Sequence, residues 1–210
     1  MLTNSRDNDA TTSPDLVELD AQAVRLSLAL AETISPGDLD KPTPCVGWTV
    51  HGLLAHMAAE NDGFAAAYDG DADPAPWKWA PQAADPVATY QRSAERVLTA
   101  FATRDLQRMM PMVTFGPDVT IPAEQAISMH LIDYVVHSWD LARSLEQPLT
   151  VDGPLLDKAW EVARMVPEDG AARTDPGAPF GPRVSWPDEP TLDGLVAYLG
   201  RSPSWPAATG

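Results

Sequence analysis

Hydrophobic residues recur at every third or fourth position in four long stretches of the chain. The stretches are 15–35, 45–73, 87–110 and 123–147, and none of them alternates with the two-residue period of a strand. All four lack proline, which breaks helix interiors because it has no backbone donor and clashes with the preceding turn. The pattern therefore predicts four long helices.

Pro-rich loops separate these helices, an organisation typical of an all-α protein built on an antiparallel four-helix bundle. Two shorter proline-free windows, 155–166 and 191–202, predict a further short helix and a short terminal helix. The Pro/Gly-rich segment 167–190 between them is expected to be an irregular covering segment, with a brief strand at 184–186. A short extended turn is expected at 115–122, before the fourth long helix.

The chain shows no internal repeat and no second hydrophobic core. We therefore expect a disordered N-terminal tail, 1–14, followed by a single bundle domain over 15–206.

Composition limits the possible partners. The net charge is −16 over 210 residues, and so acidic a surface repels phosphate backbones and anionic lipids. Neither a membrane-spanning apolar run nor a signal peptide is apparent, so we expect a cytoplasmic protein that takes a small-molecule substrate as a monomer or homodimer. The single cysteine, Cys45, excludes an internal disulfide.

The four histidines suggest a metal site. At about 100° per residue, Asp133 and His137 lie one turn apart on the same face of the fourth long helix. A carboxylate and an imidazole at this spacing can both reach one divalent ion: zinc foremost, with nickel, manganese and iron(II) as alternatives. Asp133 could instead simply pair with His137 or with Arg25.

A third ligand has to come from another helix. His51 and His56 are five residues apart, so they cannot both face one site. His56 has apolar neighbours that are expected to face the bundle, whereas His51 lies in the first turn and is expected to be more exposed. The set His56, Asp133 and His137 would leave coordination positions open, as a catalytic metal needs.

Other polar residues near these positions have two possible roles each. Glu60 and His130 are candidate catalytic groups, but Glu60 could be a solvated charge and His130 a polar residue at the mouth of the bundle. Cys45 is either a ligand or a small buried residue. Asp140 either supports His137 or forms an ion pair. The pattern does not decide whether Trp77 and Trp79 cover a pocket or pack outside the bundle.

Three motifs resemble a known family. They are Thr-Pro-Cys-Val-Gly-Trp-Thr-Val followed by Leu-Leu-Ala-His at 43–56, His-Ser-Trp-Asp-Leu-Ala at 137–142, and Leu-Gly-Arg-Ser-Pro-Ser-Trp at 199–205. Together they resemble the DinB-like four-helix-bundle superfamily. More narrowly, they resemble its actinobacterial metal-binding branch, related to the N-terminal domain of mycothiol-dependent maleylpyruvate isomerase.

The resemblance implies a bundle that holds one divalent metal through His56, Asp133 and His137. It also implies mycothiol as a co-substrate, and hence a thiol transferase or isomerase that uses a metal-activated thiolate. Two positions depart from the family pattern: Ser202 replaces the usual Asp, and Asp133 replaces the isomerase's Glu, which weakens transfer of the isomerase's own substrate. A hydrolase that uses metal-bound water and a non-catalytic metal- or ligand-binding bundle remain the alternatives.

Overall fold

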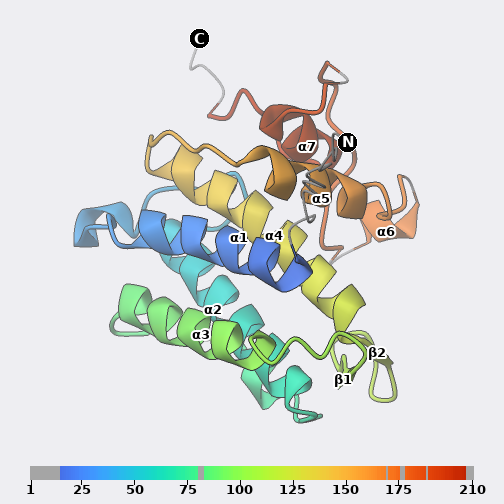
Figure 1. The fold of residues 1–210 in the computed structure, drawn as a ribbon. Helices are drawn as coiled ribbons and strands as arrows, with labels where there is room; N and C mark the ends of the chain where they lie inside the picture. Colours follow the sequence, from blue (N-terminus) through green and yellow to red (C-terminus); the bar gives the residue numbers. More distant parts are fainter. Residues whose placement is uncertain (1–14, 80–82, 169, 176–177, 188, 207–210) are drawn as a thin grey trace, which may run out of the picture.

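The structure, a computed structural model, describes residues 15–79, 83–168, 170–175, 178–187 and 189–206; the predicted tail 1–14 lies outside this part. Its main body is a bundle of four long helices (Figure 1). The helices are α1 (Leu16–Ala31), α2 (Val50–Tyr68), α3 (Pro86–Phe101) and α4 (Ala123–Ser144). The sequence thus predicted the helical class and the four-helix bundle correctly.

Side-chain caps explain where these helices begin. Thr49 accepts a hydrogen bond from the backbone of Gly52 at the start of α2, and Asp15 and Asp85 cap α1 and α3 in the same way. Each predicted window was several residues too long, because polar turns and loops occupy the ends of the proline-free stretches.

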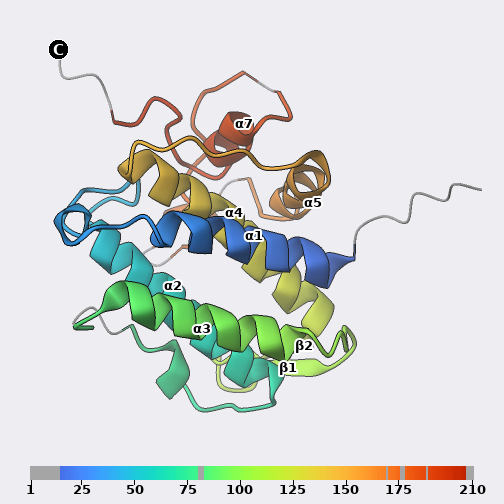
Figure 2. The same ribbon diagram turned by 60° about the vertical axis from the view of Figure 1, so that its left-hand side comes forward.

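The directions of the helices differ from a simple antiparallel bundle. Tyr68, at the end of α2, bonds Thr103, just after α3, so these two helices run parallel. Gln147, after α4, likewise bonds Thr33, after α1. The antiparallel expectation holds for α1 with α2, for α3 with α4, and for α2 with α4. It fails for α2 with α3 and for α1 with α4, because the long connection between α2 and α3 returns the chain to the starting end (Figure 2).

A small hairpin lies between α3 and α4. Strands β1 (Met109–Pro111) and β2 (Thr120–Pro122) pair antiparallel, with Met110 opposite Ile121. The extended turn expected at 115–122 thus ends in a strand. Its partner β1 was missed because it lies at the end of a proline-free window.

The C-terminal third covers one side of the bundle. It holds α5 (Gly153–Ala163), α6 (Ala171–Thr174) and α7 (Leu192–Tyr198). Two short 3-10 turns lie earlier in the chain: η1 (Pro36–Asp38) before α2 and η2 (Ala75–Trp77) before α3. The strand expected at 184–186 is absent from this described segment, where Val184 makes a backbone bond to Ala197 of α7. None of the described helices is long and apolar enough to cross a membrane.

Candidate metal site between helices α2 and α4

His56, Asp133 and His137 come together between α2 and α4. One donor atom from each lies within 4.8 Å of the other two. Nε2 of His137 is 3.3 Å from Oδ1 of Asp133, and the rings of His56 and His137 meet edge to face at 5.2 Å. Because α2 and α4 run antiparallel, the first half of α2 faces the second half of α4. The geometry thus brings together the three residues that the sequence pattern selected.

Two of the three side chains are partly accessible. About a quarter of the side chains of His56 and Asp133 is exposed, at 25% and 24%, whereas His137 is buried at 4%. Solvent therefore reaches the cluster from the side of His56 and Asp133.

The protonation states of the cluster differ. Burial, reinforced by His137, lowers the pKa of His56 to about 4, so this ring is neutral and carries a free lone pair near neutral pH. Burial works against the charged form of His137, but Asp133 and Asp140 outweigh it and raise the pKa of that ring well above its ordinary value. His137 in turn holds the pKa of Asp133 below its usual range, against the effect of burial. The cluster thus offers a carboxylate and one neutral imidazole, and its second imidazole is held by two anions.

Glu60 lies beside the cluster, one turn after His56. Its Oε1 is 3.9 Å from Nδ1 of His56, and 26% of its side chain is exposed. Burial and the nearby Asp133 raise the pKa of Glu60 to about 8. In the protein without a cation, this carboxyl group carries a proton near neutral pH.

His130 is not at the mouth of the bundle, where the sequence placed it. Its side chain is fully buried, with Nδ1 2.7 Å from Oδ1 of Asp20 and Nε2 3.1 Å from Oδ1 of Asn61. Its ring also stacks on Tyr134 at 4.2 Å. Helical spacing predicted correctly which face of α4 carries His130, but it could not predict how deeply the side chain is buried. Because the ring is fully buried and both of its nitrogens have partners, the geometry does not support a catalytic role for His130.

The loop before α2 supports the cluster from outside. Gly47 adopts a φ of 82°, which lets the chain turn sharply between Cys45 and Trp48. The Trp48 ring packs on the His56 ring at 4.8 Å, and Trp79 packs on Trp48 at 5.4 Å. Sequence reasoning missed this contact of Trp48 with the candidate ligand.

The two tryptophans left open by the sequence have different positions. Trp77 packs on α2 outside the cluster, over Gly63 and 5.1 Å from the ring of Phe64. Trp79 is 46% exposed and extends the aromatic surface that begins at Trp48. Of the two, Trp79 is the one beside the candidate site.

A second group of possible ligands, Cys45, His137 and Asp140, lies behind the first. Oδ2 of Asp140 is 2.9 Å from Nδ1 of His137, 3.2 Å from Sγ of Cys45 and 3.4 Å from a terminal nitrogen of Arg201. The guanidinium of Arg201 already supplies the positive charge at this position. A metal ion is therefore better accommodated in the first group than in the second.

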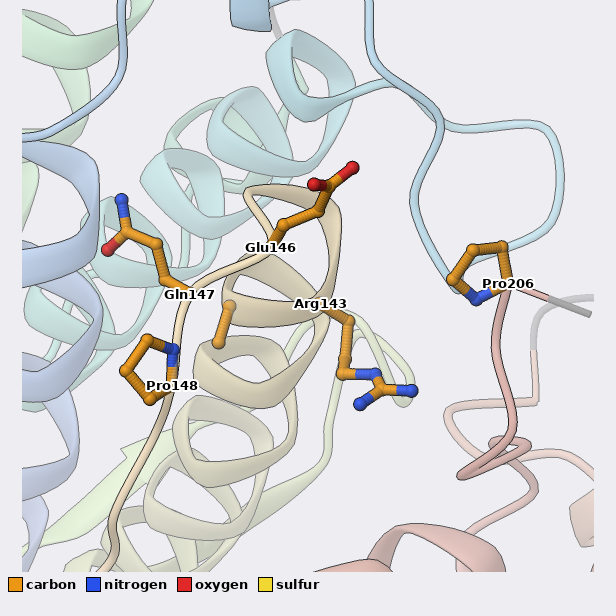
Figure 3. Close-up of a pocket in the computed structure, with 6 residues that line it drawn as sticks. Arg143, Glu146, Gln147, Pro148 and Pro206 are labelled. Carbon is orange, nitrogen blue, oxygen red and sulfur yellow. The ribbon is translucent and has the colours of Figure 1, made fainter.

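Two open hollows on the surface lie away from the cluster. Their volumes are about 370 and 360 Å³, and both adjoin the C-terminal end of α4 around Arg143 and Pro148. Figure 3 shows the first, with Pro206 facing Arg143. Arg143 already donates to the carbonyls of Pro203 and Trp205, and none of the three candidate ligands lines either hollow. These hollows carry no chemistry that could be linked to the cluster.

Comparisons with known proteins agree with this architecture. Two curated relatives, uncharacterized protein MT0763 and uncharacterized protein Rv0738, come from two strains of Mycobacterium tuberculosis. Each is 27% identical over 182 residues, which cover 83% of this chain and 91% of the relative. No solved structure matches the chain significantly. The family model described as the mycothiol maleylpyruvate isomerase N-terminal domain matches residues 21–142, more than half of the sequence, and the chain belongs to this family.

Proposed function

We propose that this protein binds one divalent metal ion through His56, Asp133 and His137 and uses it in thiol chemistry, as a mycothiol-type transferase or isomerase. The observation that carries the proposal is the convergence of the three donor atoms within 4.8 Å, from two helices. Membership of a mycothiol-related family supports the choice of a thiol as co-substrate.

The donor set fits a divalent cation. Two imidazoles and one carboxylate suit zinc foremost, and also nickel, manganese and iron(II). His56 is neutral near pH 7, since its pKa is lowered to about 4, and can donate its lone pair without first losing a proton. His137 would give up the proton on Nε2 while its Nδ1 stays on Asp140.

Three protein ligands leave room for a substrate atom. A cation held there would stabilise the anion of a bound thiol and so produce a nucleophile near neutral pH. Trp48 covers one side of His56 and limits the access of water from that side. The carboxyl group of Glu60 faces the same region and can hold or pass on a proton.

The arginines indicate that the substrate is not strongly anionic. Arg25, Arg143 and Arg201 are three cations that could attract an acidic substrate. Arg25 pairs with Glu18, and Arg143 donates to backbone carbonyls of the C-terminal segment. Arg201 pairs with the buried Asp140. Because each already has a partner, they favour a neutral thiol and a neutral electrophile.

The thiol reaction can be tested with a fluorogenic electrophile. Purified protein loaded with zinc or nickel is mixed with mycothiol, or with another low-molecular-weight thiol, and with monochlorobimane. The thiol sulfur forms a bond to the bimane carbon, while chloride and a proton leave. We expect a rate above that of metal-free protein. The absence of any such excess with every thiol tried would overturn the thiol proposal.

A second candidate is a metal-dependent hydrolase with water as the nucleophile. The position of Glu60 beside His56 favours it, because a carboxylate there could act as the base. His130, the other candidate base, already has a partner on each ring nitrogen. A non-catalytic bundle, by contrast, would use the ion mainly for stability. Chelation would then lower the melting temperature strongly without loss of any activity.

A further inference from the structure

Asp140 is the most deeply buried acid that contacts the candidate site. Its side chain is fully buried, and it stands one turn after His137 on α4. Oδ2 accepts a hydrogen bond from Nδ1 of His137 at 2.9 Å and from the thiol of Cys45 at 3.2 Å. Its other oxygen, Oδ1, is buried without a partner among the described residues. The carboxylate therefore acts mainly through Oδ2, which is directed at His137.

This contact determines which nitrogen of His137 faces the cluster. An imidazole whose Nδ1 donates to a carboxylate keeps its proton there and turns Nε2 the other way. Nε2 of His137 points toward Asp133, with 3.3 Å to Oδ1. One ring is thus held between two carboxylates, and only its Nε2 side belongs to the candidate metal site.

The charge of Asp140 is itself compensated from a distant part of the chain. A buried carboxylate without a cation would be costly. A terminal nitrogen of Arg201, just after α7, lies 3.4 Å from Oδ2 of Asp140 and 3.5 Å from Sγ of Cys45. Arg201 lies beyond residues 21–142, which the family model matches. Three segments thus meet at one oxygen atom: the loop before α2, the end of α4 and the C-terminal segment.

We propose that Asp140 is a positioning residue for the candidate site: it keeps the proton on Nδ1 of His137 and fixes the ring so that Nε2 is presented to the cation. This inference rests on the proposed metal site for its consequence. The contact in which Asp140 holds the Nδ1 proton of His137 does not depend on a bound metal. The two proposals can therefore fail separately.

Nuclear magnetic resonance of protein labelled with 15N at histidine tests this directly, because the chain has only four histidines. We expect the wild-type protein to show an Nδ1 proton on His137 that exchanges slowly with water, with and without zinc. We also expect added zinc to remove the proton from Nε2 and to leave the proton on Nδ1 in place. A rapidly exchanging or missing Nδ1 proton, or zinc on Nδ1, would overturn the inference even if every variant failed to fold.

Two variants then separate positioning from stability. Asp140→Asn removes the charge that accepts from His137, and its matched control is Asp20→Asn. Asp20 is equally buried, and its Oδ1 lies 2.7 Å from Nδ1 of His130. Partners of this kind typically account for about 10- to 100-fold in metal affinity. We expect Asp140→Asn to weaken zinc binding by that factor, in competition with a chelator, and to change the spectrum of bound cobalt(II). Asp20→Asn should alter only the His130 signals.

The outcomes are distinct. Zinc affinity and His137 signals that stay unchanged in Asp140→Asn would overturn the positioning role. An equal loss of affinity in Asp20→Asn would also overturn it, because the effect would then be general destabilisation. If wild-type protein binds no zinc while its Nδ1 proton is held as expected, the metal proposal fails and the contact between Asp140 and His137 stands.

Discussion

Substitution of Asp20 by Ala should destabilise the protein strongly, although Asp20 is remote from the entrance to the candidate site. The Asp20 side chain is 1% exposed and that of His130 is 0% exposed, and 2.7 Å separates Oδ1 from Nδ1. Asp20→Ala leaves the Nδ1 of His130 buried without an acceptor. A buried donor left without its acceptor costs about 1–3 kcal/mol of unfolding free energy.

The size of this effect can be expressed as a melting temperature. For a chain of this length, each kcal/mol corresponds to roughly 2–4 °C, so the expected loss is about 2–12 °C. Urea unfolding followed by circular dichroism gives the free energy, and differential scanning fluorimetry gives the melting temperature. Gln125→Ala, an exposed position on α4, serves as the control and should stay within about 0.5 kcal/mol of wild type.

A double variant makes the reasoning refutable. Asp20→Ala/His130→Phe leaves no unpaired imidazole nitrogen and no unpaired carboxylate, and Oδ1 of Asn61 loses its partner only as it does in His130→Phe alone. A phenyl ring suits the position because Phe64, Phe101 and Tyr134 already surround it. The double variant should therefore lose less than the sum of the two single variants, by about 1–3 kcal/mol. If the loss in the double variant equals the sum of the two single losses, Asp20 and His130 do not depend on each other. A loss below about 1 kcal/mol in Asp20→Ala would likewise contradict a buried hydrogen bond between them.

Two further predictions concern α2. Glu60 keeps its proton in the folded, metal-free protein up to about pH 8, whereas in the unfolded chain it loses it near 4.5. The folded state thus binds the extra proton between these values, so stability should fall as the pH rises through this window. Glu60→Gln should remove much of that fall, and urea unfolding on either side of the window measures it; an unchanged fall would contradict the burial of Glu60. Gly63→Val should cost about 1–3 kcal/mol, because its side chain would collide with the ring of Trp77. Gly153→Val, which meets open space, is the control, and equal losses in both would contradict this packing.

The helices and the ligand face were accessible from sequence because both depend on local spacing. Proline marks where a helix cannot continue, and a four-residue separation places Asp133 and His137 on one face whatever the rest of the fold does. The choice of His56 over His51 rested on its apolar neighbours, and the structure places His56 beside the other two residues.

Features that depend on long-range packing were not accessible. Periodicity shows which face of a helix is buried but not its direction, so the parallel arrangements of α2 with α3 and of α1 with α4 were missed. It also gives no depth along the bundle axis, so His130 was placed at the mouth although it is fully buried. The contact of Arg201 with Asp140 joins residues 61 positions apart, and no local pattern specifies it.

Metal content is the measurement that tests the account's central claim most directly. Plasma mass spectrometry is applied to untagged wild-type protein and to the His56→Ala and His137→Ala variants, with Gln125→Ala as a folded control. We predict about one divalent metal ion per chain in wild type and control, and its loss in both histidine variants. A wild-type protein that holds no metal, even after loading with zinc or nickel, would contradict the account. The cluster between α2 and α4 would then be only a packing arrangement of the bundle.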